Sequence, residues 1–204
     1  MNIIEAKKKV LYWSKKGYAN ALFAGTSGNL SIFLPERELV VITPSSVRYD
    51  SMLLEDIVVT DFDGNKVEGH QAPSSELKLH MAVYKNGLAK SVVHTHSPYA
   101  TAFAVNQKDI PLILIEMIPF LGGEVHCTEF APAGSIELAN IATAGLQEKK
   151  VCLLANHGVV AIGDTIEKAY IRAEYVEDAA KICKLAMIGG EIKTVSLQDI
   201  NKAK

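Results

Sequence analysis

Two histidines separated by one residue are the first candidates for chemistry in this sequence. His94 and His96 follow Val92 and Val93, and these β-branched residues favour a buried strand whose side chains alternate between two faces. The alternation puts both imidazoles on one face, where they could chelate one divalent metal ion together with ligands from elsewhere. The alternative is a pair of histidines that only make hydrogen bonds at the end of a strand.

Two further side chains of the metal-binding type lie elsewhere in the sequence. Glu76 precedes the pair in Pro-Ser-Ser-Glu, and His157 follows it, directly after the apolar run Val151–Leu154, which predicts another strand. Carboxylate and imidazole groups are both common zinc ligands. Their presence favours the metal interpretation of the histidine pair.

Three loops combine small residues with hydroxyl groups, at residues 25–29, 44–46 and 73–76. Glycines let backbone N–H groups approach an anion closely, and the third loop opens a helix predicted to run to about Tyr84, whose N-terminus favours negative charge. The recurrence predicts a phosphate site. The alternative is a set of ordinary turns and a helix cap.

Apolar periodicity and turn signals predict strands interleaved with helices. The predicted helices include residues 3–16, closed by Gly17, 99–105, 135–146 and a long one to about 188 that Asp164 and Glu167 would cap. The predicted strands include residues 30–34, 39–43, 57–61, 66–68, 124–127, 151–154 and 159–162. This order predicts a three-layer α/β/α fold with a central mixed, largely antiparallel sheet, in a single domain over residues 1–204.

Composition narrows the functional class. The chain has 204 residues, 49% of them hydrophobic and 22% charged, which suffices for a full core. A net charge of -2 gives no basic surface for nucleic acid or an anionic membrane, and no apolar run approaches the roughly 18 residues of a spanning helix. Without a signal-peptide pattern we expect a cytoplasmic protein acting on small molecules. Cys127, Cys152 and Cys183 are expected to be reduced core residues.

Five short motifs, taken in order, resemble those of the class II aldolase and adducin-head family. They are Gly25-Thr26-Ser27-Gly28-Asn29, Thr43-Pro44-Ser45-Ser46, Pro73-Ser74-Ser75-Glu76, His94-Thr95-His96 and Asn156-His157-Gly158. Within the family the pattern is closest to the L-fuculose-phosphate aldolase group. With the flanking helices, the resemblance covers nearly the whole chain.

The resemblance implies a zinc ion, or alternatively manganese or cobalt, on His94, His96 and His157, with Glu76 as a further ligand that can swing away. It implies a phosphate site made by Gly28, Asn29, Ser45, Ser46, Ser74 and Ser75. In such aldolases the carboxylate moves a proton while the metal stabilises an enediolate. The family is usually a homotetramer with each active site at a subunit boundary.

Three departures from the aldolase pattern bear on the reaction. Glu116 stands where the fuculose-phosphate aldolase has a tyrosine proton donor from the neighbouring subunit, and an acidic residue there resembles the family's methylthioribulose-1-phosphate dehydratases. Ser46 replaces the usual glycine of the second loop. Residues 197–204 lack the aromatic tail that helps to close the aldolase site.

Ser74-Ser75-Glu76 matches the aldolase pattern. By the same resemblance, the dehydratases lack this motif and the sugar-phosphate 4-epimerases carry Asp in place of Glu, so the motif favours an aldolase. A non-enzymatic, adducin-like assembly module is less favoured because all three histidines are present. His70, His80 and His126 are interpreted as ordinary surface or helix histidines. The resemblance thus predicts a class II aldehyde-lyase that reversibly cleaves a ketose 1-phosphate, similar to L-fuculose 1-phosphate, to dihydroxyacetone phosphate and an aldehyde, with Glu76 and Glu116 as catalytic residues.

Overall fold

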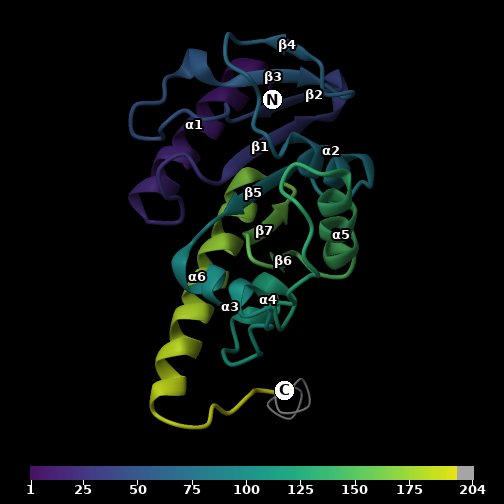
Figure 1. Ribbon diagram of the computed structural model, residues 1–204. Helices are drawn as coiled ribbons and strands as arrows, with labels where there is room; N and C mark the ends of the chain where they lie inside the picture. Colours follow the sequence, from purple (N-terminus) through teal and green to yellow (C-terminus); the bar gives the residue numbers. More distant parts are fainter. Residues whose placement is uncertain (197–204) are drawn as a thin grey trace.

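The computed structural model describes residues 1–196 and is built on one central sheet (Figure 1). Within these residues the strand order is β4-β3-β2-β1-β5-β7-β6, and every neighbouring pair of strands is antiparallel. The strands are β1 Asn29–Leu34, β2 Leu39–Ile42, β3 Val58–Asp61, β4 Lys66–Glu68, β5 Ser91–Thr95, β6 Val151–Leu154 and β7 Gly158–Gly163. The predicted, largely antiparallel sheet is confirmed.

Helices cover both faces of the sheet, which confirms the three-layer α/β/α arrangement. They are α1 Ile3–Ala19, α2 Leu77–Lys85, α3 Pro98–Val105, α4 Met117–Leu121, α5 Ile136–Leu146 and α6 Ile166–Ile188, with short 3₁₀ turns at Pro35–Arg37 and Leu54–Asp56. Buried side chains of α1, α3, α4 and α6 form one apolar cluster with the sheet, and those of α2 and α5 form the other.

The central strands are buried on both faces. Along β5, Val93 belongs to the cluster under α1 and α6, whereas Val92 belongs to the cluster under α2 and α5. Val159 and Val160 alternate in the same way along β7. Because both faces are apolar, these strands appear in the sequence as continuous hydrophobic runs rather than as alternating patterns.

Gly17 does not end the first helix, as the sequence suggested, but lies inside it. The helix continues to Ala19, and Asn20 is its C-cap. A Cβ atom at Gly17 would fall within the ring of Phe23. The glycine is therefore explained by close packing against an aromatic ring rather than by helix termination.

Two other boundaries differ from expectation. The side chain of Thr165, not that of Asp164, caps α6 and accepts a hydrogen bond from Lys168 N at 3.3 Å. Residues 124–127 form only isolated bridges, Ile110 with Val125 and Cys127 with Leu153, instead of the predicted strand. A short β-rich sequence makes a strand only where a neighbouring strand can pair along its length.

Other features agree with expectation or lie outside the described part. The three cysteines are free; Cys152 and Cys183 are buried and Cys127 is half-buried. In residues 1–196, no helix combines the length and the apolar character that crossing a bilayer requires. The expected lack of an aromatic tail at residues 197–204 falls outside the described residues.

Replacing Gly17 by alanine should destabilise the protein although alanine is the better helix former. The added methyl group would press on Phe23, and overpacking of this kind costs about 1–3 kcal/mol, against about 1 kcal/mol gained in helix propensity. Urea denaturation should give a lower free energy of unfolding for Gly17→Ala. In a Phe23→Leu background, where the ring is gone, the same substitution should cost clearly less; an equal cost would contradict the packing explanation.

Candidate active site

The site lies at one end of the three central strands. Asn29 of β1 is paired with His94 of β5, and His94 is paired with Val160 of β7. His96 follows β5 directly, and His157 directly precedes β7. Antiparallel pairing therefore brings residues from distant parts of the sequence to one edge of the sheet.

The three histidines of the predicted metal site converge. His94, His96 and His157 each offer a ring nitrogen, and these atoms lie within 4.8 Å of one another. The Nε2 atoms of His94 and His96 are 2.9 Å apart, and the three ring centroids are separated by 4.7 to 4.9 Å. Such a cluster matches the ligand set of a catalytic metal centre.

A backbone carbonyl fixes the orientation of His94. Its Nδ1 lies 2.9 Å from the carbonyl oxygen of Val159 on the adjacent strand. A carbonyl only accepts, so Nδ1 carries the proton and donates, which leaves the lone pair of Nε2 directed at the other two histidines. The pairing of β5 with β7 thus selects the tautomer that a metal ligand needs.

Burial keeps these imidazoles neutral. It lowers the pKa of His94 well below 6.5, and the neighbouring His96 and His157 add to the effect. Burial, followed by the proximity of His157, lowers the pKa of His96 to about 4. The pKa of His157 is also lowered by burial, although the nearby Glu76 opposes the shift. Neutral imidazoles are ready to bind a cation at pH 7 without first losing a proton.

Glu76 lies in the wall of the same cavity, at the start of α2. It is the N-cap residue of that helix and only 4% exposed. Among the described residues, its Oε2 atom and Nδ1 of His157 are buried without any hydrogen-bond partner. Both residues line the histidine cavity, and buried polar atoms without partners at such a place fit a bound cation. Three imidazoles and a carboxylate suit zinc and also other first-row divalent ions.

The three hydroxyl-rich loops line the same cavity as the histidines. The cavity has a volume of about 280 Å³, and its wall includes every residue predicted for the phosphate site: Gly28, Asn29, Ser45, Ser46, Ser74 and Ser75. Two backbone hydrogen bonds hold the second and third loops together, from Ser45 N to Ala72 O at 2.9 Å and from Ser74 N to Thr43 O at 3.1 Å.

Backbone conformation explains the small residues in two of these loops. Gly28 has a φ of 82°, and a Cβ atom there would lie 2.8 Å from the carbonyl oxygen of His94. Tyr49 donates a hydrogen bond of 2.5 Å to the carbonyl of Gly28 and so fixes the first loop. Ser46 has a φ of 60°, in the left-handed region that favours glycine. This backbone conformation explains why the aldolase pattern usually has glycine at the position of Ser46.

Sequence reasoning missed part of the wall. Thr26, Ser27, Pro44 and Ala133 also line the cavity. The first three belong to the recognised motifs and could have been included. Ala133 comes from the loop before α5, which carried no chemical signal. Conversely, Glu116 lies outside the cavity wall of its own chain; it is the half-buried N-cap of α4.

The interpretation of His80 as an ordinary histidine needs correction. Its side chain is fully buried, and its Nε2 lies 2.6 Å from Oδ1 of Asn29 in the cavity wall. His70 and His126 fit the original interpretation better, since both are exposed or nearly so and lie beside carboxylates, 3.3 Å from Asp56 and 2.8 Å from Asp109.

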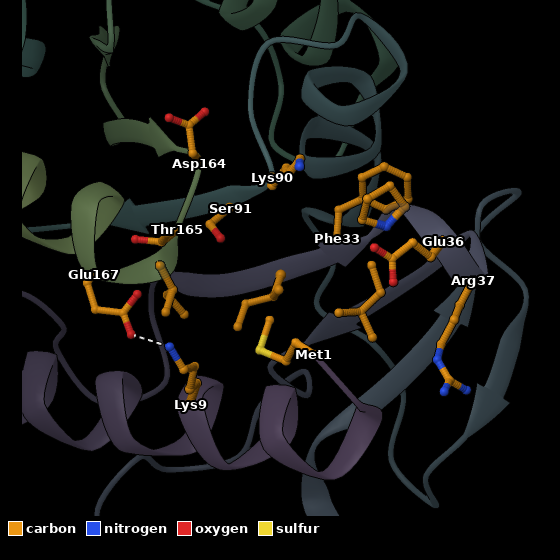
Figure 2. Close-up of a pocket in the computed structure, with 14 residues that line it drawn as sticks. Met1, Lys9, Phe33, Glu36, Arg37, Lys90, Ser91, Asp164, Thr165 and Glu167 are labelled. Atoms are coloured by element: carbon orange, nitrogen blue, oxygen red, sulfur yellow. Dashed lines mark hydrogen bonds and ion pairs between the residues drawn. The ribbon is translucent and has the colours of Figure 1, made fainter.

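A second cavity, of about 210 Å³, lies near the opposite ends of β1 and β5 (Figure 2). Its charged lining residues are Lys9, Glu36, Arg37, Lys90, Asp164 and Glu167. Positive and negative groups are equal in number, and Lys9 is paired with Glu167 at 2.6 Å. This balance selects no class of ligand, so the chemistry is assigned to the histidine-lined cavity.

Comparison with known proteins agrees with this geometry. Residues 8–183 match the sequence profile described as Class II Aldolase and Adducin N-terminal domain. The chain belongs to this family. Class II aldolases are metal-dependent lyases, and the histidine cluster provides ligands of the kind that they need.

Individual relatives in the family are sugar-phosphate aldolases. The 5-deoxy-D-ribulose 1-phosphate aldolase of Bacillus thuringiensis serovar kurstaki is 37% identical over 183 residues, which are 89% of this chain and 85% of the relative. The L-fuculose phosphate aldolase of Haemophilus influenzae is 33% identical over 202 residues, 98% of this chain and 92% of that one. A solved structure of an L-fuculose 1-phosphate aldolase superposes with a TM-score of 0.92 at 35% identity and covers 98% of this chain and 95% of its own. The protein is therefore an enzyme of the class II aldolase family.

Replacing Gly158 by alanine should weaken metal binding. A Cβ atom at Gly158 would collide with the carbonyl oxygen of Thr95 and lie 3.1 Å from Cδ2 of His96. The strand ends that carry the ligands would have to separate, so we expect about a 10- to 100-fold loss of zinc affinity. Competition with a coloured chelator measures it.

Gly64→Ala is the matched control. Gly64 has a positive φ, of 92°, and lies in the β3–β4 turn, where an added Cβ meets only Leu77 at 3.6 Å. It should lower stability and leave zinc affinity unchanged. Equal zinc affinities of Gly158→Ala and the parent protein would show that the histidine cluster tolerates strand separation, which would contradict this prediction.

Proposed function

We propose that this protein is a metal-dependent aldolase that reversibly cleaves a ketose 1-phosphate, similar to L-fuculose 1-phosphate, to dihydroxyacetone phosphate and an aldehyde. The observation that carries the proposal is one cavity that joins a three-histidine cluster to three loops suited to an anion. The names of the relatives support the substrate class, because each refers to a phosphorylated sugar.

In this proposal the phosphate group is bound by hydrogen-bond donors rather than by formal charges. The described lining residues of the cavity include neither lysine nor arginine. The donors are the backbone and side-chain groups of Gly28, Asn29, Ser45, Ser46, Ser74 and Ser75, with the N-terminus of α2 adding a favourable dipole. Neutral donors can hold a dianion when the adjacent metal site supplies positive charge.

We assign the metal to His94, His96 and His157, with Glu76 as a further ligand that can leave, and propose zinc, with manganese or cobalt as alternatives. Bound there, the ion supplies Lewis-acid stabilisation of negative charge on substrate oxygen atoms. The chain itself contributes the orientation of the three imidazoles, of which His94 is fixed by Val159, and the dry surroundings in which charge interactions are strong.

Glu76 is proposed as the base that takes the proton from carbon. Its carboxylate is buried, has an unpaired oxygen and lies close enough to His157 to influence its pKa. A carboxylate with a free oxygen beside the metal ligands is placed to accept a proton from the carbon next to the carbonyl of dihydroxyacetone phosphate in the synthetic direction, and to return it to that carbon after cleavage.

Glu116 is proposed to act in the active site of a neighbouring subunit of a homotetramer. The residue caps the short helix α4 outside its own cavity. The adjacent Ile115 is 62% exposed and Phe120 is 37% exposed, as expected for a segment that is covered on assembly. There Glu116 would take the proton from the hydroxyl group that becomes the aldehyde oxygen in the cleavage direction and return a proton to that oxygen in the synthetic direction.

The test is to incubate zinc-loaded protein with a panel of ketose 1-phosphates, including L-fuculose 1-phosphate and 5-deoxyribulose 1-phosphate, and to identify the products by NMR. Dihydroxyacetone phosphate is expected. A diketo product would instead indicate a methylthioribulose-1-phosphate-type dehydratase, and an epimeric sugar would indicate a 4-epimerase.

Removal of the metal should abolish turnover and leave cooperative unfolding intact. A fully metal-loaded protein without any activity would favour the adducin-like assembly role.

The two carboxylates should have separable effects. Glu76→Gln is expected to abolish both cleavage and the exchange of deuterium from solvent into dihydroxyacetone phosphate, because exchange needs the carbon-bound proton to be removed and cleavage needs a proton to be delivered to the same carbon. Glu116→Gln should retain the exchange and lose cleavage by about 10²- to 10⁴-fold, the usual contribution of one acid or base. Metal content is measured in parallel, so that a loss of zinc in Glu76→Gln is not mistaken for a loss of the base. Cleavage by Glu116→Gln at the parent rate would leave Glu116 a structural residue.

A further inference from the structure

A buried histidine outside the metal cluster contacts the wall of the active site. His80 of α2 is 0% exposed, and both of its ring nitrogens have partners. Nε2 lies 2.6 Å from Oδ1 of Asn29, and Nδ1 lies 2.6 Å from Oγ of Ser31. Ser31 Oγ in turn is hydrogen-bonded to the hydroxyl group of Tyr84. The four side chains form one continuous buried chain of hydrogen bonds.

The spacing of these residues explains why they meet. His80 and Tyr84 are four residues apart on α2 and therefore lie on one side of the helix. Asn29 and Ser31 are two residues apart on β1 and lie on one face of the sheet. The polar side of α2 thus packs against a polar row on β1, one turn away from Glu76.

Only one direction of proton donation satisfies this chain. Within residues 1–196, the hydroxyl group of Tyr84 has no hydrogen-bond acceptor other than Oγ of Ser31, so it donates there. Ser31 then donates its own proton to Nδ1 of His80. The imidazole is neutral because burial lowers its pKa to about 3, so its single proton is on Nε2 and is donated to Oδ1 of Asn29. In the reverse direction the Tyr84 oxygen would accept from Ser31, and its buried hydroxyl proton would have no acceptor.

The direction of the chain determines what Asn29 presents to the cavity. The two ends of a carboxamide have almost the same shape but opposite hydrogen-bonding character. Since His80 engages Oδ1, the Nδ2 group is the end that remains for the cavity, which Asn29 lines together with Gly28 and Ser45. Nδ2 is a donor, whereas Oδ1 in the same place would face an anion with a second negative dipole.

We propose that His80 is a positioning residue that holds the amide of Asn29 with Nδ2 directed at the phosphate group of the substrate. The inference rests on the proposed function, because it takes the ligand of this end of the cavity to be a phosphate. The action is indirect: His80 itself is enclosed between α2 and β1 and reaches the ligand only through Asn29.

The test measures binding of inorganic phosphate to zinc-loaded, full-length protein by calorimetry, together with KM and kcat for the ketose phosphate. His80→Leu removes both hydrogen bonds at similar volume and should weaken phosphate binding and raise KM by about tenfold or more, with a smaller change in kcat. His80→Gln, which can still donate to Asn29, should recover most of the affinity. Zinc content should be the same in all variants.

A double-mutant cycle separates positioning from general damage. Asn29→Ala alone should weaken phosphate binding, and adding His80→Leu to it should have little further effect, because His80 acts through Asn29. Ser14→Ala is the structural control. Ser14 is also fully buried and donates a hydrogen bond, to Val10 O at 2.7 Å within α1, so its loss should lower stability without changing phosphate affinity.

An NMR measurement on the parent protein needs no variant to fold. Long-range ¹H–¹⁵N spectra at pH 7 should show His80 as the pure Nε2–H tautomer, and an Nδ1–H tautomer would overturn the inference. Normal phosphate binding that is insensitive to His80→Leu would also overturn the role of His80 while leaving the proposed function intact. Failure of the parent protein to bind phosphate would instead overturn the phosphate site, and this inference with it.

Discussion

Antiparallel pairing of β1, β5 and β7 is the constraint on which the rest of the site depends. The register pairs Asn29 with His94 and brings the carbonyl oxygen of Val159 to Nδ1 of His94. One set of backbone hydrogen bonds therefore joins the anion loop, the first metal ligand and the group that fixes its tautomer. A shift of one residue in either pairing would turn His94 to the opposite face of the sheet. The fully buried strands around it make such a shift costly, because every apolar side chain would change faces as well.

Close packing of an aromatic ring connects this edge of the sheet to the first helix. Phe23 stacks on Tyr49 with ring centroids 4.8 Å apart and fills the space left by the missing side chains of Gly17 and Gly28. Tyr49 also donates its hydrogen bond to the carbonyl of Gly28. The conformation of the anion loop is thus fixed by the core beneath it, which preorganises its N–H groups instead of leaving them to be ordered by a ligand.

The sequence was sufficient for the parts of the site that depend on local pattern. The His-x-His pair after two valines predicted imidazoles on one face, and the structure places their Nε2 atoms 2.9 Å apart. The recurring serines predicted three loops that do line one cavity. Alternating helices and strands predicted the layers because each element carries its own periodicity.

Features that depend on contacts between distant elements were not predictable in this way. Gly17 looked like a helix end because sequence pattern does not show the ring of Phe23 that packs there. His80 looked ordinary because its partners, Asn29 and Ser31, lie far away in the sequence and are brought close only by packing of α2 on β1. Ala133 has no polar group, so only its position identifies it as part of the cavity wall. The role proposed for Glu116 depends on a neighbouring subunit, which the sequence of one chain does not describe.

The helix α2 provides a physical link between the two halves of the proposed chemistry. Glu76, His80 and Tyr84 follow one another at intervals of four residues and therefore occupy one side of the helix. Glu76 lies beside the metal ligand His157, His80 holds Asn29, and Tyr84 anchors the far end by stacking on Phe33 of β1 at 5.3 Å. Because these side chains share a rigid backbone, any movement of α2 relative to β1 changes the position of the carboxylate and the hydrogen bonding of Asn29 together. In the proposed chemistry, both groups are on one short helix, so a single packing interface sets the distance between the base and the phosphate-binding donors. Binding of the phosphate group would then also position the carbon atom whose proton Glu76 transfers.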